Sequence, residues 1–264
     1  MPTVHVNGID CYYERTGSGP RLLFLNGTGS TLETSALLIS PFTERFEVVA
    51  HDQRGLGRTS IPEGPYSMAD YATDAAALLD AVGWDTTRVV GISFGGMVAQ
   101  ELAVTWPERV ERLGLMCTSP GGVGGASYPL QDLEQLDPDE RVAQGAQLLD
   151  TRFTPGWLAA HPGDQALVDM VAQRADAVAD PETRRGQAEQ LLARAGHDVC
   201  DRLHLVACPT LVACGRYDGI APPANGKEIA TRIAGAELRE YEGGHAFMAQ
   251  DPAAYPDITT FLEG

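Results

Sequence analysis

Basic residues are scarce in this chain of 264 residues. It has 19 lysines and arginines against 36 aspartates and glutamates, which gives a formal net charge of −17. Binding of nucleic acid needs a basic surface that meets the phosphates, so we expect no nucleic-acid partner. An acidic surface also repels anionic membranes. Without an expected nucleic-acid or membrane partner, we expect a small-molecule ligand or substrate.

Long apolar runs and targeting signals are missing as well. No run approaches the ~18 residues that a transmembrane helix needs, and Met1–His5 lacks the basic and apolar segments of a signal peptide. The five cysteines form no Cys-x-x-Cys pair, which favours free thiols in a reducing compartment. No histidine or cysteine spacing suggests zinc, and no phosphate-binding loop is present. The sequence predicts a cytoplasmic protein without membrane association, metal or cofactor.

Short apolar segments alternate with helical patterns at both ends of the chain. An N-terminal hairpin is expected around Asn7-Gly8, a dipeptide suited to a type I′ turn. Segments that are apolar throughout are typical of parallel strands covered by helices on both faces. The alternation predicts the α/β class, with a mostly parallel, doubly wound sheet. The strands expected after the hairpin are 22–25, 48–50, 89–92, 113–117, 211–214 and 237–241.

Residues 120–200 interrupt this alternation, because they contain no strand-like run and are rich in Ala, Gln, Asp and Arg. Helices are expected over Pro138–Leu149, Gln165–Val178 and Pro181–Ala195, whose first residues suit a first helical turn. We interpret 120–200 as a helical cap inserted after the sixth strand. Residues 1–119 and 201–264 then form the core. The cap would lie over the C-terminal edge of the sheet, where open α/β sheets bind ligands.

The segment Gly91-Ile92-Ser93-Phe94-Gly95 joins an expected strand to an expected helix. A Gly-x-Ser-x-Gly match can arise by chance among 29 glycines, so its position between strand and helix is the deciding feature. So tight a turn places the serine oxygen above the sheet. The next amide, that of Phe94, opens a helix and favours an anion. The pattern predicts Ser93 as a catalytic nucleophile.

A serine nucleophile needs a base and an acid, which follow it along the chain in this arrangement. His245 comes after the last expected strand, in a glycine-rich loop, and Asp218 follows the strand 211–214. We predict His245 as general base and Asp218 as the group that orients it. The alternatives are a plain loop histidine and an aspartate that bonds its own turn. Weaker rivals lie outside strand ends: His161, His197, His204, Asp198 and Asp201.

With these residues placed, the chain resembles the α/β-hydrolase superfamily, in particular its enol-lactonase, small-ester esterase and C–C hydrolase branches. Gly215–Asp218 and Gly243–His245 are similar to the family's acid and histidine loops. Asp52–Ser60 resembles the glycine turn after the fourth strand, to which we assign a structural role. The resemblance implies the α/β-hydrolase fold with a cap.

One departure from the family concerns the oxyanion loop, where most members have His-Gly. This chain has Asn26-Gly27-Thr28-Gly29 instead. The resemblance implies that the Thr28 amide supplies the second oxyanion donor beside the Phe94 amide. We expect Asn26 and Gly27 to contact substrate. Among the cap aromatics, Trp157 is the candidate contact, with Phe153 and Tyr128 as alternatives, although helical aromatics are more often simply buried.

These residues predict a hydrolase that cleaves a carboxylic ester or lactone of a small organic molecule through an acyl-enzyme. Three alternatives stay open: a C–C bond hydrolase of vinylogous diketones, a cofactor-free lyase, cyclase or oxygenase, and a small-molecule receptor on the same fold. The sequence does not identify the substrate or the oligomeric state.

Overall fold

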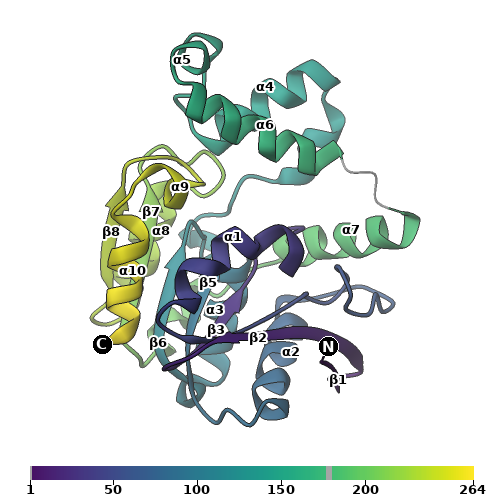
Figure 1. Cartoon of the computed structure of the whole chain (residues 1–264), viewed down its shortest axis with the longest axis vertical. Helices are drawn as coiled ribbons and strands as arrows, with labels where there is room; N and C mark the ends of the chain where they lie inside the picture. Colours follow the sequence, from purple (N-terminus) through teal and green to yellow (C-terminus); the bar gives the residue numbers. More distant parts are fainter. Residues whose placement is uncertain (1, 177–179) are drawn as a thin grey trace.

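The computed structural model describes residues 2–176 and 180–264. Within these residues, eight strands form one sheet (Figure 1). They span Thr3–Val6 (β1), Ile9–Gly17 (β2), Arg21–Leu25 (β3), Glu47–His51 (β4), Thr87–Ile92 (β5), Val110–Met116 (β6), Thr210–Gly215 (β7) and Glu237–Tyr241 (β8). The order across the sheet is β1-β2-β4-β3-β5-β6-β7-β8. β3 to β8 pair in parallel, while β1 and β2 pair antiparallel. The predicted sheet is confirmed.

The N-terminal hairpin turns at Asn7-Gly8, as predicted. Both residues have positive φ, 45° and 76°, and a type I′ turn requires positive φ at both central positions. The antiparallel pairing of β1 with β2 follows from this turn.

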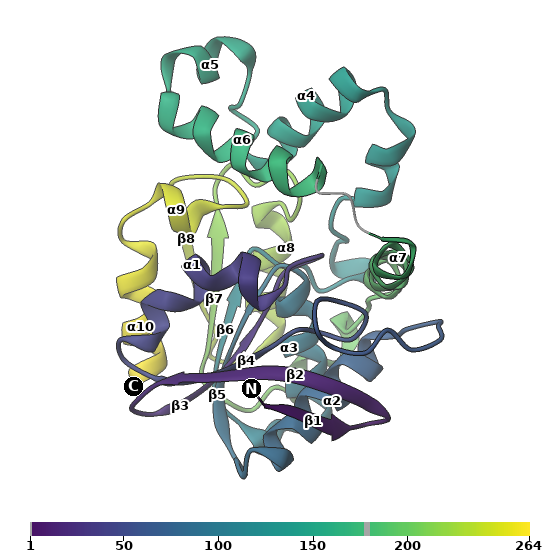
Figure 2. The same cartoon turned by 45° about the vertical axis from the view of Figure 1, so that its right-hand side comes forward.

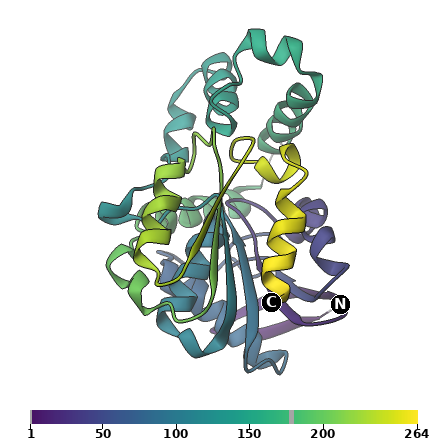
Figure 3. The same ribbon diagram turned by 90° about the vertical axis from the view of Figure 1, so that its left-hand side faces the viewer.

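Helices cover both faces of the sheet. Those of the core span Leu32–Thr43 (α1), Met68–Ala81 (α2), Phe94–Thr105 (α3), Pro223–Arg232 (α8), Phe247–Gln250 (α9) and Ala254–Glu263 (α10). Side chains of α2, α3 and α8, such as Tyr71, Leu102 and Ile229, share one buried cluster. Phe42 of α1 and Ile258 of α10 belong to the cluster on the opposite face. Figure 3 shows α8 and α10 on the two sides of the sheet. The doubly wound arrangement is confirmed.

Between β6 and β7 the chain forms four α-helices in its described residues: Pro138–Leu149 (α4), Pro155–Ala160 (α5), Pro162–Asp176 (α6) and Pro181–Ala195 (α7). Two of the three predicted helices have these bounds, and the third begins at Pro162 instead of Gln165. Its predicted last residues, 177–178, lie outside the described residues. The short helix α5 was not predicted. In Figures 1 and 2, α4 to α6 lie beyond the strand ends, while α7 lies closer to the core.

Short 3-10 turns connect these elements, at Pro107–Arg109, Gly122–Gly124, Leu130–Gln135 and Cys200–Leu205. In the part of the chain that the structure describes, no helix is both long and apolar enough to cross a lipid bilayer.

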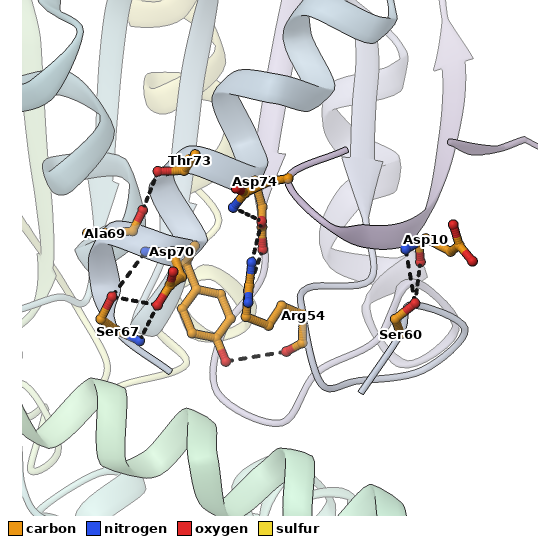
Figure 4. A network of polar contacts seen from close by, with 10 residues as sticks. Asp10, Arg54, Ser60, Ser67, Ala69, Asp70, Thr73 and Asp74 are labelled. Atoms are coloured by element: carbon orange, nitrogen blue, oxygen red, sulfur yellow. Dashed lines mark hydrogen bonds and ion pairs between the residues drawn. The ribbon is translucent and has the colours of Figure 1, made fainter. Parts of the chain in front are cut away.

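The loop after β4 has the structural role assigned to it from the sequence. Asp52 accepts hydrogen bonds from the Leu32 amide (2.7 Å) and the Arg58 amide (2.9 Å). The Arg54 guanidinium binds both carboxylate oxygens of Asp74 on α2, at 2.7 and 2.8 Å (Figure 4). Both partners of this ion pair are buried. The loop is therefore fixed to two helices that flank the sheet.

Candidate active site

Ser93 occupies the tight turn between β5 and α3. Its backbone has φ 54° and ψ −113°, a strained conformation for a residue with a side chain. The neighbouring glycines are required by space: a Cβ at Gly91 would clash with the carbonyl of Gly95, and a Cβ at Gly95 would clash with the carbonyl of Leu25. The Gly-x-Ser-x-Gly pattern thus follows from the close approach of strand and helix.

Three polar side chains from three loops form a connected chain. Ser93 Oγ lies 3.0 Å from His245 Nε2, and His245 Nδ1 lies 2.8 Å from Asp218 Oδ2. An ionised carboxylate only accepts hydrogen bonds, so Nδ1 carries the proton that binds Asp218. Nε2 of the neutral imidazole is then free to accept the Ser93 proton. The structure thus brings together all three residues predicted to form the triad.

The Asp218 carboxylate is fully buried and uses both of its oxygens. Oδ1 accepts hydrogen bonds from the amides of Ile220 and Ala221, both at 2.8 Å, while Oδ2 binds His245. The alternative of an aspartate that bonds its own turn is thus also true. The turn contacts hold the carboxylate in place for its contact with the imidazole.

The segment between β6 and β7 contacts the histidine loop. The His245 amide donates to the carbonyl of Leu149 at the end of α4, with a distance of 2.6 Å. Gln250 accepts a hydrogen bond from the Gly244 amide (2.9 Å) and donates one to Asp150 (3.0 Å). Asp150 is completely buried. No sequence pattern indicated these contacts, because they join segments about 100 residues apart.

The loop after β3 lies beside the serine. A Cβ built on Gly27 would be 3.8 Å from the Cβ of Ser93. Asn26 is buried, and its Nδ2 donates to the carbonyl of His51 at 3.4 Å. Its Oδ1 has no hydrogen-bond partner among the described residues. The roles of the Thr28 and Phe94 amides, and substrate contact by Asn26 and Gly27, stay predictions.

Trp157 lines a cleft of about 370 Å³ together with Arg152, Leu167 and Glu242, and its Nε1 donates to Asp164 at 2.7 Å. Among the described residues, the lining of this cleft includes no member of the triad. The structure therefore gives no support to the predicted substrate contact of Trp157.

The two alternative aromatics have structural contacts. Phe153 is buried in a small cluster with Leu149 and Val168. The Tyr128 amide donates to the carbonyl of Ile220 at 2.8 Å, next to the turn that carries Asp218.

Three polar residues near the end of α7 were missed as site residues. Gln190 and Arg194 received no role from the sequence, and His197 was set aside because it lies in the insertion. All three are buried, and Gln190 Oε1 accepts a hydrogen bond from the Gly29 amide at 2.7 Å. Gln190 and Arg194 lie four residues apart and therefore share one face of α7. On a polar helix, that spacing is equally typical of a solvated face.

The cysteines behave as core residues. All five are free. Burial raises the pKa of the Cys214 thiol to about 12 and raises that of Cys117 as well. Among the described residues, no group of three or more His, Cys, Asp or Glu side chains is placed to hold a metal ion.

The fold and the turn at Ser93 agree with a known family. The family model described as the alpha/beta hydrolase fold matches residues 20–252. This chain belongs to the α/β-hydrolase family. Within that family, it is 30% identical over 237 residues to 3-oxoadipate enol-lactonase 2 of Acinetobacter baylyi, covering 89% of this chain and 85% of the relative.

Two further comparisons place this α/β-hydrolase among hydrolytic enzymes. It is 32% identical over 247 residues to a poly(3-hydroxyalkanoate) depolymerase of Ectopseudomonas oleovorans, covering 92% of this chain and 84% of that protein. The crystal structure of the enol-lactonase from Burkholderia xenovorans LB400 superposes with a TM-score of 0.81 at 25% identity, covering 100% of both chains. The family and these relatives support hydrolase activity for this chain.

Proposed function

We propose that this α/β-hydrolase cleaves a carboxylic ester or lactone of a small organic substrate through an acyl-enzyme on Ser93. One observation carries the proposal: the Ser93 hydroxyl, the His245 imidazole and the buried Asp218 carboxylate follow one another at 3.0 and 2.8 Å. This is the geometry of a nucleophile, its base and the group that orients the base.

The first half-reaction forms the acyl-enzyme. His245 Nε2 takes the Ser93 proton as Oγ bonds to the carbonyl carbon, and Asp218 stabilises the imidazolium. The amides of Phe94 and Thr28 donate to the oxyanion, and each is worth about 10²–10³ in rate. Phe94 is the first residue of α3, so its N–H has no acceptor within the helix. His245 then gives its proton to the leaving alkoxide.

The second half-reaction uses water. His245 takes a proton from water as its oxygen attacks the acyl carbon, and returns that proton to Ser93 as the acid leaves. In a lactone, the leaving alkoxide stays attached to the acyl group, so the product is a single hydroxy or keto acid. An enol-lactonase and a polyester depolymerase among the relatives support an acyl–oxygen bond as the target.

The surroundings of this reaction are part of the proposal. We propose that residues 120–200 form a cap over the core of residues 1–119 and 201–264, and that the cap limits the substrate to a small molecule. The hydrogen bond between the His245 amide and the Leu149 carbonyl supports a cap that reaches the triad. The free cysteines support the reducing cytoplasm as the location.

Labelling with a fluorophosphonate tests the nucleophile. We expect a single adduct in the intact mass of the wild-type protein and none in Ser93→Ala. Thr28→Ala is the matched control, because it keeps the backbone amide and should retain both adduct and activity. An unlabelled wild type, or equal labelling of Ser93→Ala, would remove the serine-hydrolase mechanism.

A substrate comparison tests the bond type. Aryl esters and small lactones should be cleaved, while vinylogous ring-fission diketones should not. The reverse preference would favour the C–C hydrolase alternative on the same triad. Labelling without turnover of either class would favour the receptor alternative.

A further inference from the structure

A second cavity is lined in part by residues that follow β6 and by the first turn of α3. Its volume is about 200 Å³, and its lining includes Met97, Ser119, Arg194 and His197. The Met97 amide donates to the Ser93 carbonyl at 3.2 Å, one helical turn along α3. Thr118, the neighbour of Ser119, donates its hydroxyl to the same carbonyl at 2.8 Å. Two lining residues, Met97 and Ser119, thus lie next to the turn that carries the proposed nucleophile or to a residue that binds it.

Arg194 lines this cavity and forms no ion pair within the part of the chain that the structure describes. It is only 5% exposed, and Nη1 donates to the Tyr128 carbonyl at 2.8 Å. Nε and Nη2 have no hydrogen-bond partner among the described residues. Burial lowers the pKa of Arg194 to about 10, which still leaves it charged at neutral pH. A buried charge without a partner is costly, so this guanidinium is suited to bind an anionic group.

The unused edge of Arg194 has a defined shape. Nε–H and Nη2–H lie on one side of the planar guanidinium and point in the same direction. Two parallel donors of this kind match the two oxygens of a carboxylate. The partnered Nη1 fixes the plane of the group, so the free edge is held in place.

A neighbouring residue adds a neutral group to the lining of the cavity. This residue is His197, which lies just after α7 and close to the backbone of Ser119. Burial lowers the pKa of His197 to about 4, so the ring is neutral at pH 7. Its nearby carboxylate, Glu101, is already bound by Arg202 at 2.7 and 2.8 Å.

Other contacts hold α7 on the core, so docking does not depend on the free edge of Arg194. A Cβ on Gly186 would clash with the Gly55 carbonyl, which shows a close helix–loop approach. Arg185 donates to the carbonyls of Ile61 and Pro62 at 2.8 and 2.7 Å. The donors of Arg194 are therefore available for a ligand.

We propose that this cavity binds a carboxylate group of the substrate, with the Nε–Nη2 edge of Arg194 as its ion partner. This inference rests on the proposed function and names its substrate class: a small ester or lactone that also carries a free carboxylate on a short chain. A cavity of about 200 Å³ admits only a few carbon atoms beyond the carboxylate. The acidic surface slows the approach of such an anion, and the buried cation provides its local attraction.

Calorimetric titration of the Ser93→Ala variant tests the site independently of hydrolysis. The probes are levulinate, its neutral amide levulinamide, and inorganic phosphate. We expect levulinate to bind at least about tenfold more tightly than levulinamide, because a hydrogen bond to a charged group exceeds one to a neutral group. Arg194→Gln should abolish that difference, and Arg194→Lys should retain part of it. Arg184→Gln, on an exposed position of the same helix, is the matched control and should keep it.

Several outcomes would overturn the carboxylate site. These are equal binding of levulinate and levulinamide, an unchanged preference in Arg194→Gln, or binding of phosphate without levulinate. If Arg194→Gln fails to fold, the test uses the ratio of the levulinate and levulinamide dissociation constants. That ratio is compared between Ser93→Ala and the double variant Ser93→Ala/Arg194→Lys, and an unchanged ratio would contradict the role of Arg194. Binding of levulinate by a protein that no fluorophosphonate labels would leave the anion site standing and remove the proposed function instead.

Discussion

Gln190 of the helix α7 binds the loop that lies beside Ser93. Its Oε1 accepts a hydrogen bond of 2.7 Å from the amide of Gly29, which has a φ of +66°. Gly29 directly follows Thr28, whose amide is the proposed second oxyanion donor. One buried residue of α7 thus holds the loop that carries the proposed oxyanion donor.

Gln190→Met keeps the volume of the side chain but removes the acceptor. Without it the Gly29 amide loses its partner and the loop loses a fixed position, so we expect kcat to fall about tenfold with a small change in KM. Steady-state kinetics on an aryl ester measure both. Gln187→Met makes the same change at a half-buried position of the same helix and should match the wild type. A change in KM alone would assign Gln190 to substrate binding and not to positioning.

Asp218→Asn should reverse the tautomer of His245. The amides of Ile220 and Ala221 require an acceptor, so the asparagine would turn its oxygen to them and its NH₂ toward His245 Nδ1. Nε2 would then carry the proton and could not accept one from Ser93. We expect kcat to fall about 10³–10⁴-fold with the fold intact. Asp85→Asn, an exposed aspartate, is the control; a loss below about tenfold in Asp218→Asn would contradict the proposed role.

The pH dependence of the reaction follows from the role of His245 as general base toward Ser93. A general base accepts a proton only when it is unprotonated, so kcat/KM should rise with pH along one ionisation and then level off. Initial rates at low substrate concentration across the pH range measure this profile. A rate that stays flat from acidic to alkaline pH, for a substrate whose chemistry is limiting, would exclude His245 as the base.

Gly95→Ala and Gly145→Ala place the same methyl group in two helices with opposite results. At Gly95 the Cβ would clash with the Leu25 carbonyl, whereas at Gly145 it meets nothing within 4 Å. We expect Gly95→Ala to lose several kcal/mol of stability and its activity. Gly145→Ala should gain about 0.5–1 kcal/mol, because alanine favours the helix. Urea denaturation measures both, and similar effects of the two changes would contradict the steric account of the turn.

His197 should make the protein less stable in acid. Burial lowers its pKa to about 4 in the folded protein, while an unfolded histidine titrates near ~6.5. As the pH falls below about 6.5, this histidine takes up a proton in the unfolded chain but not yet in the folded protein. The free energy of unfolding is therefore highest above that pH and falls as the pH approaches 4. His51, whose pKa burial also lowers to about 4, adds a second loss of the same sign.

The variant His197→Gln isolates the first of these two histidines. Between about pH 7.5 and 5, its free energy of unfolding should fall by about 2 kcal/mol less than that of the wild type. The contribution of His51 is common to both proteins and cancels in this comparison. Urea denaturation at the two pH values measures the difference, and equal losses in the two proteins would contradict a neutral, buried His197.

The elements that depend on local sequence could be predicted. The turn at Asn7-Gly8 requires two positive φ angles, and the turn at Ser93 requires glycines where strand and helix meet. Both requirements act within a few residues, so the residue types reveal them. The apolar strands likewise predicted the parallel sheet, and their order along the chain placed Asp218 and His245 at neighbouring strand ends.

Only the tertiary structure decided which polar residues between β6 and β7 are buried. Gln190 and Arg194 look like members of a solvated helix face in the sequence, because their spacing suits either environment. Their burial depends on how α7 docks against the loops of Gly29 and Gly55. For Trp157 the sequence suggested a substrate contact, but the residue lines a cleft whose described lining includes no member of the triad. Docking of a helix is a sum of weak contacts between distant segments, and no local pattern specifies it.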